Sequence, residues 1–126
     1  DRYGYLALRA IEEKVVLDLD CDNDVIATGG SAVYSNAAMS HLKALGMVAF
    51  LKVDMATLKA RIHNYDMRGL AKHPDQTLED LFVERSSLYR LYAAVIIECD
   101  GLRHEEVCIK IIQELKANKS RRVKEA

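Results

Sequence analysis

The 126-residue sequence lacks features that define several classes of protein. No apolar run approaches the ~20 residues of a membrane-spanning helix, and nothing resembles a secretory signal peptide. The formal net charge of −1 lacks the basic excess of a nucleic-acid-binding domain. We therefore expect no membrane or nucleic-acid partner, and a small molecule as the ligand.

Metal-ligand and nucleophile motifs are also missing. The three cysteines, Cys21, Cys99 and Cys108, are odd in number and have no CxxC spacing, which fits reduced thiols in a cytoplasmic protein. The four histidines form no HExxH motif, and there is no Ser-His-Asp arrangement. The sequence also has no GxxxxGK[ST] phosphate loop. No metal site is predicted.

The rest of the chain is organised around residues 24–35. Residues 24–28 (DVIAT) form a short β-branched apolar run that predicts a buried strand, and Gly29 and Gly30 predict a tight turn without side chains. In a parallel sheet, ligands usually bind at the carboxyl ends of the strands, where glycine permits close approach to the backbone. A glycine pair is more often only a turn, so its meaning depends on the other elements.

The order of elements predicts a layered α/β domain that comprises residues 1–126. Helical periodicity covers residues 3–19, 35–45, 54–63, 77–92 and 104–115, and apolar runs predict further strands at 47–53 and 94–99. Strands that alternate with helices indicate a parallel sheet. In the first helix, we expect the buried face to be Tyr5, Leu8, Ile11, Val15 and Leu19.

Local signals predict where helices begin and where order ends. Ser35 and Asp54 are expected to cap the helices that follow them, and Thr77 with Asp80 approximates a capping box. Residues 64–76 hold the only proline and no periodic pattern, which predicts a long loop that acts as a lid. Residues 117–126 predict a basic, disordered tail.

Four arginines stand out as candidates for binding an anion. Arg9 lies on the first helix, Arg61 before the predicted lid, Arg68 inside it and Arg85 on the helix after it. Guanidinium groups bind carboxylate and phosphate oxygens bidentately. Each alone is more often a surface arginine, but their distribution around a glycine turn and a lid favours an anion site.

Four segments resemble the shikimate kinase family, in the right order and spacing. Residues 28–33 (TGGSAV) are similar to its TGGGAV segment, and residues 84–89 (ERSSLY) to its ERxPLY segment. Residues 68–70 (RGL) lie where the family has RPL in its lid, and residues 9–12 (RAIE) match its RxxE helix. The resemblance extends from about residue 9 to residue 115.

This resemblance implies a P-loop kinase-like fold of the nucleoside monophosphate kinase type, with three α/β/α layers around a parallel sheet. It implies transfer of the γ-phosphoryl of ATP, with Mg²⁺, to the 3-hydroxyl of shikimate, a step towards chorismate and the aromatic amino acids. By position, Arg9 and Arg85 would hold the shikimate carboxylate, and Gly29 and Gly30 would abut its ring hydroxyls. The catalytic Arg68 would close over the phosphoryl group of ATP, and Arg61 would lie against adenine.

The sequence departs from the family pattern at three positions and lacks its P-loop. Ser31 replaces the third glycine, Gly69 the lid proline and Ser87 the proline before Leu88. The family's P-loop strand and helix, which hold most of the ATP- and Mg²⁺-binding elements, would precede residue 1. We therefore interpret the chain as a C-terminal portion of this fold, truncated at the N-terminus, and expect it to be inactive by itself. The full-length protein is expected to be a monomer.

Two alternatives stay open at this point. The same fold could serve a different hydroxylated acceptor, as in relatives of gluconate kinase or nucleoside monophosphate kinases, although Arg9 and Arg85 favour an acceptor with a carboxylate. The chain could also be a non-catalytic binding domain that has lost its P-loop. In this fold the P-loop strand would lie between residues 24–28 and 47–53, so its loss would leave both strand edges without ladder partners.

Overall fold

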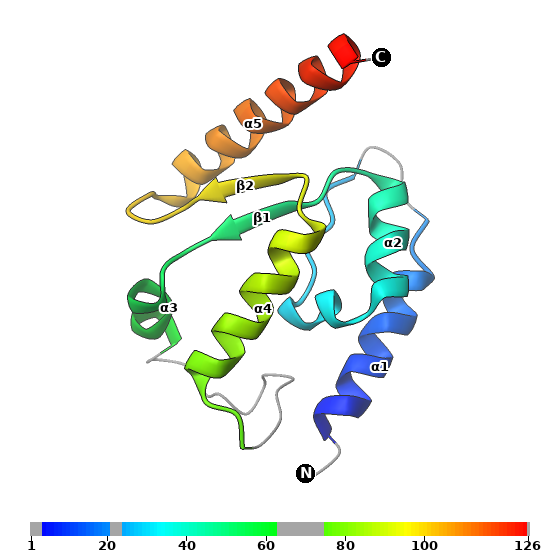
Figure 1. Ribbon diagram of the computed structural model, residues 1–126, viewed down its shortest axis with the longest axis vertical. Helices are drawn as coiled ribbons and strands as arrows, with labels where there is room; N and C mark the ends of the chain where they lie inside the picture. Colours follow the sequence, from blue (N-terminus) through cyan, green and yellow to red (C-terminus); the bar gives the residue numbers. More distant parts are fainter. Residues whose placement is uncertain (1–3, 21–23, 63–74, 126) are drawn as a thin grey trace.

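The computed structural model describes residues 4–20, 24–62 and 75–125, and these follow an α/β order (Figure 1). The described elements are α1 (Gly4–Leu17), the 3₁₀ helix η1 (Gly30–Tyr34), α2 (Asn36–Leu45), β1 (Ala49–Lys52), α3 (Met55–Ile62), α4 (Leu78–Tyr92), β2 (Val95–Glu98) and α5 (His104–Glu125). Figure 1 shows α5 beyond one side of the sheet and α4 beyond the other, with α1 and α2 further out past α4. The predicted layered α/β architecture is confirmed.

The sheet consists of β1 and β2, which pair in parallel. Ala49 lies opposite Val95, and Lys52 lies opposite Glu98. In addition to the backbone hydrogen bonds between the strands, the Lys52 ammonium forms a salt bridge with the Glu98 carboxylate at 3.2 Å. Parallel strands need a crossover connection, and here α3 and α4 lie within it. Both strands fall inside the ranges predicted from their apolar runs.

One part of the core lies on the α5 face of β2. The other buried apolar side chains belong to α1, η1, α2 and α4: Val16, Ala32, Val33, Ala38, Met39 and Leu81. Alternation along the strand buries Val95 and Ile97, and Ile97 is fully buried. Cys99 continues this face just after β2, and apolar side chains of α5 pack against it: Val107, Ile111 and Leu115. On the opposite face, the ring of Phe50 lies 5.0 Å from the ring of Tyr89 on α4, measured between centroids. The sheet is therefore the middle layer between two helices.

The predicted helix starts are confirmed by the capping hydrogen bonds. The Ser35 hydroxyl accepts from a backbone N–H in the first turn of α2 at 3.0 Å. The Asp54 carboxylate accepts from the Thr57 N–H at 2.7 Å at the start of α3. At α4, Thr77 and Asp80 form a reciprocal capping box with bonds of 3.1 and 3.2 Å. These bonds satisfy backbone donors that have no partner within a helix.

The prediction of a buried strand at residues 24–28 is wrong. Residues 24–29 have no regular secondary structure, and the Val25 side chain is 98% exposed. A strand requires a neighbour that supplies ladder hydrogen bonds. Among the described residues the only sheet is β1 with β2, and these two strands pair with each other. The segment instead leads through Gly29, the cap residue of η1, into a 3₁₀ helix.

The buried face predicted for α1 is also wrong. Leu8, Ile11 and Val15 are 42%, 62% and 58% exposed, whereas Val16 is 4% exposed. The Ser31 and Ser35 hydroxyls donate to Glu12 and Glu13, on the side of α1 that packs against η1 and α2. The covered side of α1 therefore carries these two carboxylates and Val16 in place of the predicted apolar stripe.

The C-terminal residues differ from the predicted disordered tail. The structure continues α5 to Glu125, well past Leu115. Residues 116–125 contain neither glycine nor proline and are rich in lysine and arginine, which favour helix. Most of the predicted lid, residues 64–74 of 64–76, lies outside the described residues. Among the helices that are described, none combines the length and the hydrophobicity that crossing a membrane requires.

The two faces of β2 supply a direct test of the core. We expect Ile97→Ala to lower the free energy of unfolding by about 3 kcal/mol, because it leaves a cavity in a fully buried site. Ile96→Ala is the matched control, since the Ile96 side chain is 43% exposed. This substitution should cost less than about 1 kcal/mol. Urea unfolding followed by circular dichroism measures both. Equal losses in the two variants would contradict this placement of the core.

Candidate active site

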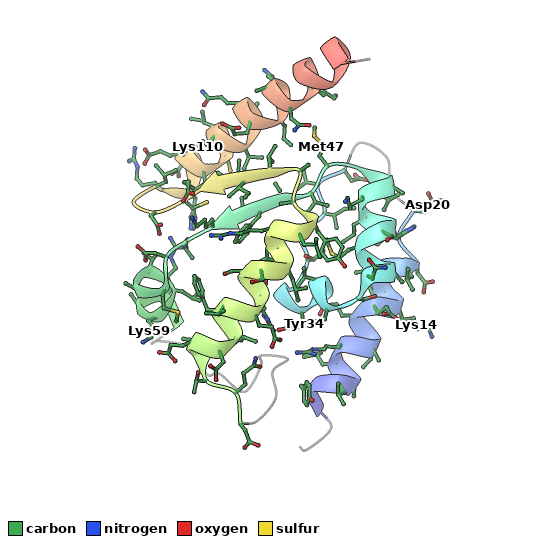
Figure 2. All side chains as sticks on the ribbon, viewed as in Figure 1. Lys14, Asp20, Tyr34, Met47, Lys59 and Lys110 are labelled. Atoms are coloured by element: carbon green, nitrogen blue, oxygen red, sulfur yellow. The ribbon has the colours of Figure 1, made fainter. Side chains whose placement is uncertain are left out.

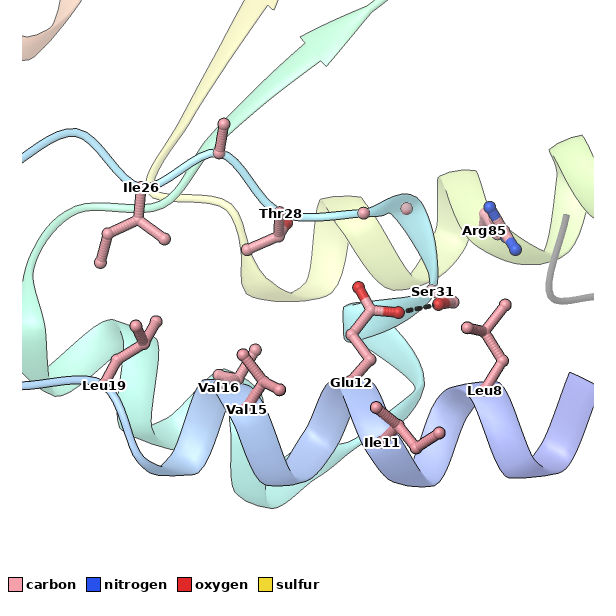
Figure 3. A pocket seen from close by; sticks show the side chains of 13 residues that line it. Leu8, Ile11, Glu12, Val15, Val16, Leu19, Ile26, Thr28, Ser31 and Arg85 are labelled. Atoms are coloured by element: carbon pink, nitrogen blue, oxygen red, sulfur yellow. Dashed lines mark hydrogen bonds between the residues drawn. The ribbon is translucent and has the colours of Figure 1, made fainter. Parts of the chain in front are cut away.

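A groove of about 540 Å³ lies between α1 and residues 26–31. Figure 3 shows apolar side chains of α1 along one wall, with Ile26 and Thr28 facing them from the other. At one end the lining becomes polar, and Glu12, Ser31 and Arg85 meet beside the two glycines. The full lining is Leu8, Ile11, Glu12, Val15, Val16, Leu19, residues 26–31 and Arg85.

The polar end is fixed by hydrogen bonds between α1 and η1. The Ser31 hydroxyl donates to Oε2 of Glu12, as the dashed line in Figure 3 shows, and the Ser35 hydroxyl donates to Glu13. Ser31 is buried, so its hydroxyl needs such a partner. The other carboxylate oxygen of Glu12, Oε1, is buried and accepts no hydrogen bond from any described residue. Glu12 therefore has one carboxylate oxygen bonded to Ser31 and one buried oxygen beside Gly29 without a donor among the described residues.

The two glycines allow three side chains to reach the backbone of the turn. A Cβ atom on Gly29 would lie 2.8 Å from Oε1 of Glu12. A Cβ atom on Gly30 would lie 2.7 Å from Nη1 of Arg85 and 2.8 Å from the hydroxyl oxygen of Tyr89. The Tyr89 hydroxyl donates to the Gly30 carbonyl at 2.8 Å. Only glycine fits at these two positions without displacing their neighbours.

The guanidinium groups of Arg9 and Arg85 meet at the ring of Tyr34. The Cζ atom of Arg9 lies 3.6 Å from the ring centroid, and that of Arg85 lies 5.6 Å from it. Arg9 also lies 5.1 Å from the ring centroid of Tyr5, one turn earlier on α1. All three distances lie within the ≈ 6 Å range of cation–π attraction. Two cations are thereby gathered beside the glycine turn.

The tyrosines of the site remain neutral at physiological pH. Burial raises the pKa of Tyr89, and the charge of Arg85 opposes this only in part. Burial also raises the pKa of Tyr34, with Glu84 acting in the same direction and Arg85 against it. Both hydroxyls therefore keep their protons, and the charges that a ligand meets are those of the arginines and carboxylates.

The structure brings together four of the six predicted site residues. Arg85, Gly29 and Gly30 line the polar end of the groove, and Arg9, which is not part of its lining, meets Arg85 at the ring of Tyr34. Arg61 lies elsewhere, exposed on α3. It lines a second hollow of about 490 Å³ together with Leu102, Arg103, His104 and Glu105. Arg68 lies outside the described residues, so its predicted role stays a prediction.

Sequence reasoning missed two contributions to the site. Tyr34 lies inside the organising stretch, but nothing in its local pattern indicates that two arginines will meet at its ring. The ring of Tyr89 packs on Phe50, and its hydroxyl also donates to the glycine turn. The only sequence signal is the helical spacing of Arg85 and Tyr89, which places both on one side of α4.

A parallel two-stranded sheet together with a glycine turn at which arginine side chains converge defines an α/β protein with a cationic candidate site. The profile of the shikimate kinase family matches residues 1–116. This chain belongs to the shikimate kinase family, whose members are kinases with the P-loop kinase fold. The resemblance seen in four sequence segments is thereby confirmed.

Individual relatives agree with this assignment. The chain is 34% identical over 119 residues to a shikimate kinase from Colwellia psychrerythraea. The matched region covers 91% of this chain and 69% of that protein. The chain is 33% identical to shikimate kinases from Alteromonas mediterranea and Halorhodospira halophila, covering 91% and 95% of this chain and 69% and 70% of those proteins. None of the solved structures matches the chain.

Crowding at the glycine turn can be tested with a pair of glycine variants. We expect Gly30→Ala to cost about 1–3 kcal/mol of stability, because Arg85 and the Tyr89 ring must both move away from the added methyl group. Gly46→Ala is the control, since its backbone is extended and no atom lies within 4 Å of the added Cβ. Thermal unfolding compares them. Equal stability of the two variants would show that the turn is not crowded.

Proposed function

We propose that the polar end of the groove is the acceptor site of a shikimate kinase-like phosphotransferase, which transfers the γ-phosphoryl of ATP to the 3-hydroxyl of shikimate. The observation that carries this proposal is the convergence of Arg9 and Arg85 at one tyrosine ring beside Gly29 and Gly30. Membership of the shikimate kinase family supports the choice of acceptor.

The arginines suit the carboxylate of the acceptor. A guanidinium group binds a carboxylate through two parallel N–H···O bonds and keeps its charge at every physiological pH. Arg9 comes from α1 and Arg85 from α4, so a carboxylate bound by both would connect the two helices. Such a site selects acids over neutral sugars, which distinguishes it from relatives that phosphorylate uncharged acceptors.

The glycine turn and Glu12 suit the hydroxyl groups of the acceptor. Glycine allows a ligand to approach the backbone closely. Oε1 of Glu12 lies beside Gly29 and lacks a donor among the described residues. It is therefore the atom proposed to accept a hydrogen bond from a ligand hydroxyl. Apolar side chains continue the groove beyond this end, where the carbon ring of the ligand would lie. Its volume of about 540 Å³ is typical of small-molecule sites.

The second hollow suits the base of a nucleotide. Arg61 offers a planar guanidinium that stacks on aromatic rings, and Leu102 adds an apolar surface. When bound, ATP supplies the transferable phosphoryl group. For Mg²⁺ the described residues do not provide a fitting site, because none of them form a group of three acidic, histidine or cysteine side chains able to hold a metal. No step is therefore assigned to Mg²⁺, and Arg68 remains the proposed residue over the phosphoryl group.

We expect the 126-residue chain to bind the acceptor without transferring phosphate to it. Its sequence has no GxxxxGK[ST] segment, whose backbone N–H groups and lysine cradle the phosphates of ATP. Release of ADP that depends on both ATP and shikimate, measured with the purified chain, is the assay. ADP release above the rate without shikimate would contradict this expectation, and would show that other residues hold the phosphates.

Binding of shikimate tests the acceptor site itself. We expect Arg85→Met to weaken shikimate binding at least tenfold, which is about 1.4 kcal/mol, because one of two charged contacts to the carboxylate is lost. Arg90→Met on the same helix is the control, since Arg90 is exposed and lines no part of the groove. Isothermal titration calorimetry measures both. Equal affinities, or tighter binding of the shikimate methyl ester than of the acid, would contradict a carboxylate site.

A further inference from the structure

We propose that Tyr34 is a positioning residue of the acceptor site: its ring gathers the Arg9 and Arg85 guanidinium groups into one carboxylate-binding pair. Nothing in the family motif at residues 28–33 includes this tyrosine, which follows the motif directly. The inference rests on the proposed function, because it assumes that the pair binds the carboxylate of the acceptor.

Distances between the groups support this role. Arg9 lies 3.6 Å from the centroid of the Tyr34 ring, which is direct contact with its π system, and Arg85 lies 5.6 Å from the same centroid. Arg9 and Arg85 belong to α1 and α4, which lie far apart in the sequence. In Figure 2 Tyr34 is seen between these two helices. One ring is therefore the common contact of both cations.

Electrostatics explain why a ring is needed at this point. Two guanidinium groups that lie close together repel each other. The negative face of an aromatic ring attracts a cation without carrying a net charge. Tyr34 can thus hold both arginines near one another without adding a charge to the site. A carboxylate in the same place would hold them too, but would compete with the ligand.

The backbone of η1 fixes the ring where the arginines can reach it. Ser31, at the second position of η1, is bonded to Glu12 of α1, and Ser35, which follows its end, is bonded to Glu13 of the same helix. From the other side, Tyr89 of α4 donates to the carbonyl of Gly30. A short helix tied to α1 and α4 at its ends gives the Tyr34 side chain little freedom to move. The arginines are consequently arranged before any ligand arrives.

The first test needs no ligand. Protons above the face of an aromatic ring resonate upfield, so the Hδ and Hε protons of Arg9 should be shifted upfield in the nuclear magnetic resonance spectrum of the wild-type chain. Tyr34→Leu should reduce this shift to the smaller part that the more distant Tyr5 ring contributes, and Tyr34→Phe should keep it, because phenylalanine retains the ring. Tyr92→Leu on α4 is the control for the loss of a half-buried tyrosine, and it should leave the Arg9 resonances unchanged.

The second test measures shikimate binding to the same variants by calorimetry. We expect Tyr34→Leu to weaken binding about tenfold, and Tyr34→Phe to stay within about twofold of the wild type. Rescue by phenylalanine separates the role of the ring from that of the hydroxyl. An unshifted Arg9 in the wild type, or equal affinity of wild type and Tyr34→Leu, would overturn the inference.

The two tests separate this inference from the proposed function. If the wild-type chain does not bind shikimate while Tyr34 still shifts Arg9, the acceptor assignment is wrong and the ring remains the organiser of the two arginines. If the wild type binds shikimate and the Tyr34→Leu variant binds it equally well, the acceptor assignment stands and the role of Tyr34 is refuted. The buried methyl groups of Ile97 report in every spectrum whether the variant is folded.

Discussion

The site depends on the closeness with which side chains from two helices approach the backbone at Gly29 and Gly30. Glu12 reaches this turn from α1, and Arg85 and Tyr89 reach it from α4, all at distances that a Cβ atom would not tolerate. The turn is thus the point where α1, η1 and α4 meet. Because glycine has no side chain, Glu12 and Arg85 can both lie against the backbone of the turn, and this fixes the distance between their charged groups.

Tyr89 connects this turn to the middle layer of the fold. Its ring packs on Phe50 of β1, and its hydroxyl donates to the Gly30 carbonyl. Arg85 lies four residues earlier on the same face of α4, so the position of one affects the position of the other. The packing of α4 on the sheet therefore sets the height of Arg85 above the groove. In this way, the hydrophobic layers and the charged site share one helix.

The sequence predicted what is determined locally and failed where distant partners decide. The caps at Ser35, Asp54 and Thr77 depend on atoms within three residues, and all three were predicted. Residues 24–28 have the composition of a strand, but a strand exists only with a ladder partner, which no local pattern reveals. The covered face of α1 carries two carboxylates that bond to residues 31 and 35, which lie about twenty positions away.

The same distinction applies to the site. Spacing and resemblance indicated Arg9, Arg85 and the glycines, because these residue types carry the chemistry of anion binding. The contribution of Tyr34 could not be predicted, since it depends on how η1 lies between two helices that are remote in the sequence.

Ser31 shows why a departure from the family pattern is compatible with this site. Positions 29, 30 and 31 are consecutive, yet their surroundings differ. At the first two, an added Cβ would meet Glu12, Arg85 or Tyr89 below 3 Å. At the third, the side chain points to Oε2 of Glu12 and finds a hydrogen-bond acceptor there. A buried hydroxyl is costly only when it has no partner. Serine therefore stands at a position of the turn where a polar side chain has both room and a partner.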